Sequence, residues 1–163
     1  MSLPELKIGH GYDVHRLIED RKLVLGGVEI PYKKGLLGHS DADVLAHALM
    51  DALLGAMRAG DIGQLFPDTD PAYEGADSMV LLSHVMQLVR DKGFELLDCD
   101  CTVAAQAPKL LPYREAMRNR MAEVMGVTPD KVGVKATTTE GLGFVGQQEG
   151  IAAWAVVLLG RSE

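Results

Sequence analysis

The order in which strand patterns and helix patterns follow one another constrains the fold of this chain most. Segments with an apolar residue at every second position predict strands, and apolar residues three and four positions apart predict helices. Along the 163 residues the predicted order is strand, short strands, helix, helix, strand, helix, strand, strand. Such a mixture is typical of helices layered on a sheet. We therefore expect one α+β domain spanning residues 1–163, with a mixed β-sheet and helices packed on one face.

The first strand is predicted over residues 6–15, where apolar side chains alternate with small and charged ones. Gly9 and Gly11 keep its second face sterically empty. Residues 23–30 predict a hairpin that turns at Gly26-Gly27. The remaining strands are predicted over residues 94–105, 131–139 and 151–160, the last two joined by a glycine-rich loop.

The clearest helix is predicted over residues 41–59, with Ser40 as its N-cap and Asp43 three residues later, as in a capping box. Two further helices are predicted over residues 78–92 and 113–125, each followed by a glycine. Residues 31–39 are expected to form a loop. Residues 61–74 predict an irregular loop, because glycine and proline interrupt them.

The charge balance limits the kinds of partner. Lys and Arg number 16 against 23 Asp and Glu, a net charge of −7, which argues against a surface that holds nucleic acid or an anionic membrane by charge alone. Arg58 is the only Lys or Arg between Gly35 and Val89, so a phosphate bound by this stretch needs cations from elsewhere. No apolar run approaches the roughly 20 residues of a membrane-spanning helix. With no secretory signal in the sequence, we expect a cytoplasmic protein whose Cys99 and Cys101 are reduced.

A candidate metal site lies in the first strand. Asp13 and His15 are two positions apart, on one strand face and about 7 Å from each other along the backbone. His47, in the predicted helix, would add a third ligand, and two histidines with one carboxylate leave the open position of a catalytic zinc site. The alternative is a strand-end Asp and His that make ordinary hydrogen bonds.

Three loops carry further candidate residues. His39 precedes the predicted Ser40 cap, beside a helix N-terminus suited to an anion, unless it is simply an exposed loop histidine. Residues 61–63 and 66–70 form a carboxylate-rich loop that could accept hydrogen bonds from a polyol, or could merely stabilise itself through Asx turns. Residues 105–111 combine small residues with the positive charge of Lys109, whose alternative reading is a solvated lysine.

The end of the next strand offers oxygen ligands. If that strand persists beyond residue 137, Thr138 and Glu140 share a face, where a hydroxyl donor for phosphate would lie beside a magnesium-type ligand. The alternative is that the run of threonines is no more than good strand sequence.

Six segments together closely resemble the 2-C-methyl-D-erythritol 2,4-cyclodiphosphate synthase family of the non-mevalonate isoprenoid pathway. They occur in the family order and cover nearly the whole chain. The segments are Gly9-His10-Gly11-Tyr12-Asp13-Val14-His15, Gly38-His39-Ser40-Asp41-Ala42-Asp43, Gly60-Asp61-Ile62-Gly63, Phe66-Pro67-Asp68-Thr69-Asp70-Pro71, Ala105-Gln106-Ala107-Pro108-Lys109 and Lys135-Ala136-Thr137-Thr138-Thr139-Glu140.

The resemblance implies a phosphorus–oxygen lyase that closes a cyclic diphosphate and releases CMP. It also implies a homotrimer with active sites at subunit interfaces, zinc held by Asp13, His15 and His47, and magnesium or manganese held by Glu140. His39 and Thr138 would be catalytic, stabilising the transferring phosphoryl group. The implied substrate-binding residues are Asp13, His15, His39, Ser40, Asp61, Ile62, Gly63, Phe66, Pro67, Asp68, Thr69, Asp70, Ala105, Gln106, Ala107, Pro108, Lys109, Leu110, Leu111, Thr137, Thr138, Thr139, Glu140 and Phe144.

One region departs from the family pattern. Gln147 and Gln148 follow Phe144-Val145-Gly146, where a basic residue is common in the family, and Trp154 replaces a smaller or acidic side chain. An anionic isoprenoid in a cavity on the trimer axis is therefore not carried over to this chain. Two other functions stay open from the residues: a metal-dependent hydrolase using the same centre, and a non-catalytic cytidine-nucleotide module.

Overall fold

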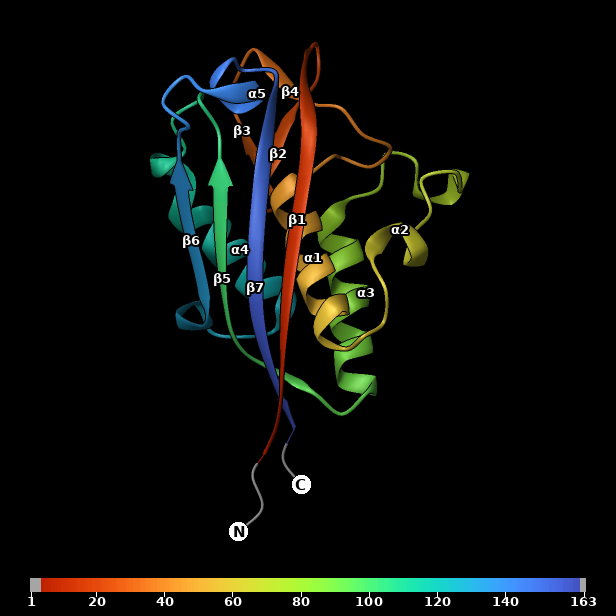
Figure 1. The fold of residues 1–163 in the computed structure, drawn as a ribbon. Coiled ribbons are helices and arrows are strands. Elements are labelled where there is room, and N and C mark those ends of the chain that lie inside the picture. The colour runs from red at the N-terminus through yellow and green to blue at the C-terminus, as the bar shows by residue number, and fades with distance from the viewer. Residues whose placement is uncertain (1–3, 162–163) are drawn as a thin grey trace.

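A mixed five-stranded sheet forms the frame of the molecule (Figure 1). The computed structural model describes residues 4–161. The strand order is β4-β1-β7-β5-β6, in which only the β5–β6 pair is parallel. The expected mixed sheet is confirmed. Its strands are β1 (Glu5–Glu19), β4 (Lys34–Leu36), β5 (Glu95–Ala104), β6 (Val132–Thr137) and β7 (Gly150–Arg161).

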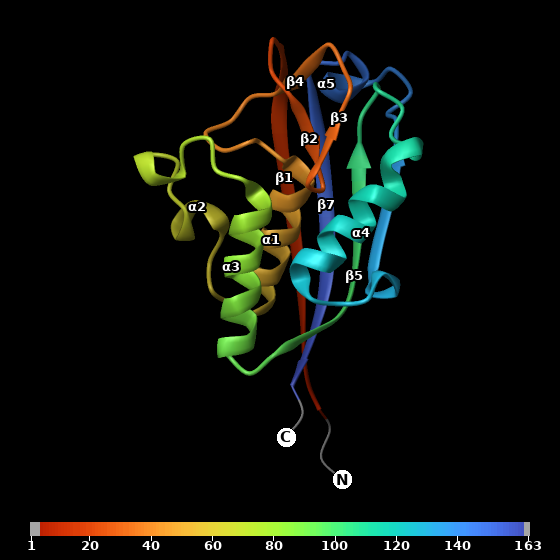
Figure 2. The ribbon, with the colours of Figure 1, turned by 180° about the vertical axis from the view of Figure 1, so that it is seen from behind.

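The three long helices cover one face of this sheet, as expected (Figure 2). They are α1 (Val44–Ala56), α3 (Ser78–Asp91) and α4 (Arg114–Met125). The predicted hairpin is β2 (Leu23–Leu25) with β3 (Val28–Ile30), which pair as a separate two-stranded sheet. Short helical turns occur at α2 (Ile62–Leu65), η1 (Pro71–Tyr73), η2 (Leu111–Tyr113), η3 (Pro129–Lys131) and α5 (Gly143–Gly146). No helix within residues 4–161 is long and apolar enough to cross a membrane.

The glycine face of β1 lies directly against α1. A Cβ on Gly9 or Gly11 would stand 1.9 Å from the backbone oxygen of Ala52 or Ala48, so only glycine permits this approach. The close contact brings the strand that carries Asp13 and His15 next to the helix that carries His47. The two glycines therefore set the spacing of the candidate metal ligands.

The other face of β1 and β7 is apolar and open. Ile8 is 65% exposed and Leu6 53% exposed, and Tyr12 packs on its cross-strand partner Trp154 with ring centroids 5.3 Å apart. Val14 and Val156 add to the same exposed surface. A continuous apolar patch of this kind marks an interaction surface.

The cap of α1 was predicted wrongly. The helix begins at Val44 rather than Asp41, and its N-cap is Asp43. The Asp43 carboxylate accepts hydrogen bonds from the amides of Ala46, Gly26 and Gly27, so it joins the helix to the turn of the hairpin. The helix ends at Ala56 and not at residue 59, because Arg58 takes a left-handed conformation at φ 57°.

Three predicted loops contain regular structure. Residues 31–39 include β4, whose Leu36 pairs with Leu17 of β1. The loop over residues 61–74 contains α2 and η1, and the glycine-rich loop contains α5. These elements are three or four residues long, which is too short for a periodic signal. Cys99 and Cys101 are free, as expected, and both are buried; the hydrogen bond that the Cys101 thiol makes to Cys99, together with burial, raises the pKa of Cys101.

Candidate metal centre and substrate cleft

Asp13, His15 and His47 converge on one point between β1 and α1. Oδ2 of Asp13 lies 2.9 Å from Nε2 of His15 and 3.3 Å from Nδ1 of His47. The two ring nitrogens are themselves 3.3 Å apart. The three side chains are largely buried, and they form the one cluster of potential ligands found in the described part of the chain.

The chemistry of these atoms fits a divalent cation. Nδ1 of His15 lies 2.9 Å from the backbone oxygen of Leu37; because a carbonyl only accepts, Nδ1 carries the hydrogen and Nε2 presents a lone pair. Oδ2 of Asp13 is buried and receives no hydrogen bond of proper geometry from the described residues. Three electron-rich atoms thus face one another, an arrangement that a bound cation stabilises.

The cluster also shifts the protonation of its members. Burial acts to raise the pKa of Asp13, but the imidazoles of His15 and His47 beside its carboxylate outweigh it and lower that pKa to about 2. Burial likewise acts to lower the pKa of His15, whereas Asp13 and the Leu37 carbonyl raise it, and the net direction is upward from 6.5. When His15 is protonated it forms an ion pair with Asp13, and when it is neutral its Nε2 lone pair is available to a cation.

A cleft of about 320 Å³ opens above the cluster. Most of its wall consists of residues singled out from the sequence, joined by residues that the sequence did not indicate. The lining residues are Asp13, His15, Gly38, His39, Ser40, His47, Ile62, Gly63, Phe66, Asp68, Tyr73 and Leu81. The expectation of a metal site beside a ligand-binding loop is consistent with this geometry.

His39 lines the cleft, but it does not stand directly before the helix cap as predicted. It precedes the true cap, Asp43, by four positions, and its Nε2 donates to the backbone oxygen of Asp70 at 3.0 Å. The amide of Gly75 donates to the backbone oxygen of His39 at 2.7 Å. His39 therefore ties the loop before α1 to the loop before α3, and it is half-buried rather than an exposed loop histidine.

The carboxylates of the loop over residues 61–74 accept hydrogen bonds largely from amides of the loop itself. Asp61 accepts from the amide of Gln64, and Asp70 from the amide of Ala72, both at 2.9 Å. These are the local turns that we named as the alternative to polyol binding. Asp68 lines the cleft, whereas Pro67 and Thr69 flank it. Phe66 stacks edge-on against Tyr73 with ring centroids 5.3 Å apart and forms the apolar wall.

A second hollow, also about 320 Å³, lies at the ends of β5 and β6. It collects the other predicted group: Ala105, Gln106, Pro108, Lys109, Leu110, Leu111, Thr137 and Thr138, together with Ala136. Ala107 lies within the same segment, although it does not line the hollow. The two hollows share no lining residue in the described chain, so the predicted site falls into two separate halves.

The prediction that Thr138 and Glu140 share a strand face is wrong. β6 ends at Thr137, and Glu140 has a left-handed φ of 55°. The two residues instead form a tight turn, in which the Glu140 amide donates to Oγ1 of Thr138 at 3.3 Å. The hydroxyl of Thr139 donates to the backbone oxygen of Leu142 at 2.7 Å, and Phe144 lies in the adjoining α5.

Sequence reasoning missed several residues of the cleft. Tyr73 and Leu81 line it, and Asp51 accepts from the amide of Ile62 at 2.8 Å and so places α2. Asp51 carried a usable signal, because it follows His47 by four positions on the same helix face. Ser78, which contacts Nε2 of His47 at 2.9 Å, carried none beyond its place at a helix start.

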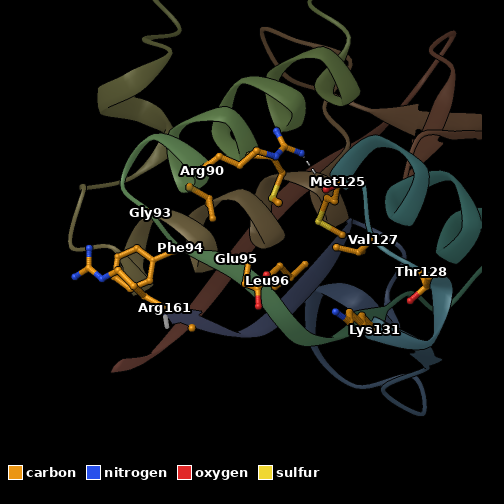
Figure 3. A pocket seen from close by; sticks show the side chains of 14 residues that line it. Arg90, Gly93, Phe94, Glu95, Leu96, Met125, Val127, Thr128, Lys131 and Arg161 are labelled. Atoms are coloured by element: carbon orange, nitrogen blue, oxygen red, sulfur yellow. Dashed lines mark hydrogen bonds between the residues drawn. The ribbon is translucent and has the colours of Figure 1, made fainter. Parts of the chain in front are cut away.

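A larger hollow of about 600 Å³ lies between the C-terminal ends of α3 and α4 (Figure 3). None of its lining residues was predicted to bind a metal or a substrate. Arg90 donates to the backbone oxygen of Met125 at 3.3 Å, and Arg161 to that of Lys92 at 2.9 Å. The guanidinium of Arg161 also lies 4.3 Å from the ring centre of Phe94.

Comparisons with known proteins agree over nearly the full chain. A family profile described as the YgbB family matches residues 6–160. A 2-C-methyl-D-erythritol 2,4-cyclodiphosphate synthase from Trichlorobacter lovleyi is 63% identical over 154 residues, which cover 94% of this chain and 98% of that protein. The protein of the same name from Clostridioides difficile is 57% identical over 154 residues, covering 94% and 96%.

Solved structures give the same picture. A structure described as this synthase in its CDP-bound form matches with a TM-score of 0.86 at 44% identity, covering 94% of this chain and 99% of that one. The bifunctional IspDF from Campylobacter jejuni matches with a TM-score of 0.95 at 46% identity; the match covers 99% of this chain and 44% of that longer one.

Proposed function

Because the chain belongs to the YgbB family, we propose that it converts 4-diphosphocytidyl-2-C-methyl-D-erythritol 2-phosphate into 2-C-methyl-D-erythritol 2,4-cyclodiphosphate and CMP. This is a lyase reaction of the non-mevalonate isoprenoid pathway. The observation that carries the proposal is the convergence of Asp13, His15 and His47 at the floor of a cleft, most of whose wall comes from the segments typical of the family. We place the protein in the cytoplasm.

The metal centre consists of Asp13, His15 and His47, which hold a zinc-type cation. When bound, this cation supplies Lewis-acid polarisation of a phosphate oxygen. Glu140, on the turn after β6, binds a second cation, magnesium or manganese, together with the diphosphate. The first assignment is supported by the buried Asp13 oxygen, for which the described part of the chain offers no hydrogen-bond donor.

The chemistry requires alignment more than a protein nucleophile. An oxygen of the 2-phosphate forms a bond to the β-phosphorus, and the bond from that phosphorus to the oxygen of CMP breaks. Attacker and target are both anionic, so catalysis depends on neutralising charge and holding the reactants in line. His39 and Thr138 stabilise the phosphoryl group in transfer. Asp61, Ile62 and Gly63 bind the methylerythritol part, and Phe66 to Asp70 close over it.

The cytidine part binds in the second hollow. Residues 105–111 and Thr137 to Thr139 surround the nucleotide, with Lys109 near its phosphates and Phe144 at the margin. Support comes from the CDP named for a solved relative. The metal cleft and the nucleotide hollow share no lining residue among those described, which supports a complete site made from the cleft of one subunit and the hollow of its neighbour.

The assembly is a homotrimer with three such shared sites. The exposed apolar patch of β1 and β7, with Leu6, Ile8, Tyr12, Trp154 and Val156, supplies the surface that three copies bury. No axial isoprenoid site is proposed. Gln147 and Gln148 are engaged locally, with the Gly141 carbonyl and the Tyr32 hydroxyl at 2.8 and 2.9 Å.

The test is an incubation of the purified protein with the cytidylyl substrate, zinc and magnesium. CMP and the cyclic diphosphate should form in equal amounts, with no oxygen-18 entering from labelled water. Methylerythritol 2,4-bisphosphate containing solvent oxygen would instead establish a hydrolase. Binding of CMP without turnover would establish a nucleotide module. A monomeric active species in light scattering would contradict the shared sites.

A further inference from the structure

Behind the metal cluster, a chain of hydrogen bonds runs from His47 into the protein. Ser78, the first residue of α3, is fully buried, and its Oγ lies 2.9 Å from Nε2 of His47. The Ser78 hydroxyl is hydrogen-bonded to Oδ1 of Asp41. The Ser78 amide donates to the other carboxylate oxygen of Asp41 at 3.0 Å.

The direction of each bond follows from what each group can do. An ionised carboxylate only accepts, so the Ser78 hydroxyl gives its hydrogen to Asp41. The Ser78 oxygen can then only accept from His47, and Nε2 must carry the hydrogen. In a neutral imidazole this leaves Nδ1 with a lone pair, and Nδ1 is the atom 3.3 Å from Oδ2 of Asp13.

Ser40 cannot set the tautomer in the same way. Its Oγ lies 3.1 Å from Nε2 of His47 and accepts from the Ala42 amide at 3.1 Å. Within residues 4–161 its hydroxyl has no carboxylate partner, so its hydrogen is free to turn toward the cleft. Ser78 alone is held in one orientation by a charged acceptor.

We propose that Ser78, oriented by Asp41, is a positioning residue that holds His47 in the tautomer able to bind the divalent cation. This inference rests on the metal centre proposed above. It adds two residues, one from α3 and one from the loop before α1, that do not touch the cation or the substrate.

The surrounding backbone is expected to survive loss of the hydroxyl. The Asp41 amide donates to the backbone oxygen of Ala76 at 3.0 Å, and the Gly75 amide to that of His39 at 2.7 Å. These bonds join the two loops independently of the Ser78 side chain. A Ser78→Ala variant should therefore fold while His47 loses its tautomer constraint.

The first measurement is zinc affinity of the full chain in competition with a chromogenic chelator. Ser78→Ala should bind zinc about 10- to 100-fold more weakly, the usual effect of losing a partner of a metal-bound histidine. Ser83→Ala, the same change at an exposed site of α3, should bind zinc like the wild type. Asp77→Ala removes the N-cap of α3 and should lower thermal stability without changing zinc affinity.

The second measurement is the tautomer itself, from long-range proton–nitrogen NMR spectra of His47 in the metal-free protein. The wild type should show the hydrogen on Nε2, and Ser78→Ala a mixture of the two forms. Asp41→Asn should act in the same direction, because an amide that donates to Ser78 lets the hydroxyl donate to His47. Ser78→Thr keeps the hydroxyl and should restore both readouts.

Unchanged zinc affinity and an unchanged tautomer in both Ser78→Ala and Asp41→Asn would overturn the proposal. Failure of the Ser78 proposal can be distinguished from failure of the proposed function. A wild type that binds no zinc and releases no CMP would refute the enzyme assignment, whereas the tautomer of His47 would still report on Ser78.

Discussion

Among the described residues, the buried polar atom that lacks a hydrogen-bond donor lies in the smaller of two hollows and not in the larger one. The hollow between the ends of α3 and α4 measures about 600 Å³, and the cleft above the metal cluster about 320 Å³. In the larger one, both arginines already have partners: Arg90 and Arg161 donate to backbone carbonyls. In the smaller one, a buried oxygen of Asp13 has no hydrogen-bond donor among residues 4–161.

The difference shows that unsatisfied chemistry identifies a site better than volume does. Arginines that cap helix carbonyls contribute to the stability of the fold. Lone pairs that face one another cost stability unless a ligand joins them. Substitutions in the two regions should therefore separate cleanly: those in the cleft change metal binding and turnover, whereas those in the larger hollow change stability alone.

Removing a metal ligand should give the largest effect. His47→Ala takes one of three ligands from the cluster, so zinc should be lost, and turnover should fall by about 10³-fold, equivalent to about 4 kcal/mol. Metal analysis and CMP release measure the two losses. His10→Ala, an exposed histidine of the same strand as His15, should retain zinc. Full activity of a zinc-free His47→Ala protein would contradict the ligand assignment.

Widening the contact between β1 and α1 should give the second-largest effect. Gly11→Ala forces a methyl group against the Ala48 carbonyl and should cost about 3 kcal/mol of unfolding free energy. Zinc affinity should fall with it, because Asp13 moves away from His47. The control is Gly55→Ala in α1, whose added Cβ meets only the His10 oxygen, at 3.7 Å, and which should be neutral or slightly stabilising. Urea unfolding and chelator competition give both quantities.

Acidification should weaken zinc binding but stabilise the metal-free protein. The pKa of His15 is raised above 6.5, so protons compete with metal, and zinc affinity should fall at least about tenfold between about pH 7.5 and about pH 5.5. The metal-free protein should behave conversely: a raised histidine pKa contributes stability that is present below 6.5 and is lost as pH rises through the folded-state value. Stability that rises with pH in the metal-free protein over this range would contradict the ion pair.

The acid limit of that ion pair follows from Asp13. Its pKa is lowered from 3.8 to about 2, so its contribution is present above 3.8 and is lost as pH falls toward 2. The ion pair should therefore contribute most to the stability of the metal-free protein between about pH 4 and about pH 6.5.

The smallest effect is expected in the larger hollow. Arg161→Ala removes the cation over the Phe94 ring and should lower the unfolding free energy by less than about 1 kcal/mol. Zinc affinity and CMP release should stay at wild-type values. Arg120→Ala, which removes an exposed ion pair on α4, gives the baseline for stability. A loss of turnover in Arg161→Ala would break the separation between the two regions.

Sequence patterns predicted the long elements because their periodicity extends over many residues. The strand of Asp13 and His15 and the helix that ends before Gly126 agree with the structure, whereas the short hairpin was predicted from its Gly26-Gly27 turn. The grouping of Asp13, His15 and His47 followed from spacing and resemblance, and the geometry agrees.

What failed depended on competition for hydrogen bonds. Ser40 satisfies the rule for an N-cap, but the Asp43 carboxylate also accepts from the distant amides of Gly26 and Gly27, and this tertiary gain moves the helix start. The strand predicted over residues 131–139 ends at Thr137, because Glu140 adopts a left-handed turn. Ser78 escaped notice because its role depends on Asp41, 37 residues away along the chain.

The pairing of β1 with β7 has a consequence for how this domain can be joined to others. Glu5 stands opposite Arg161, so the described chain enters and leaves at neighbouring points, where β1 and β7 run side by side (Figure 1). Asp13 lies eight residues further along β1, roughly 26 Å away at about 3.3 Å per residue. A partner fused at either point would emerge from the same end, remote from the metal cleft. Fusing a partner at either point, replacing that partner by another, or joining the two points in a circular permutant should therefore leave the shape of the cleft unchanged.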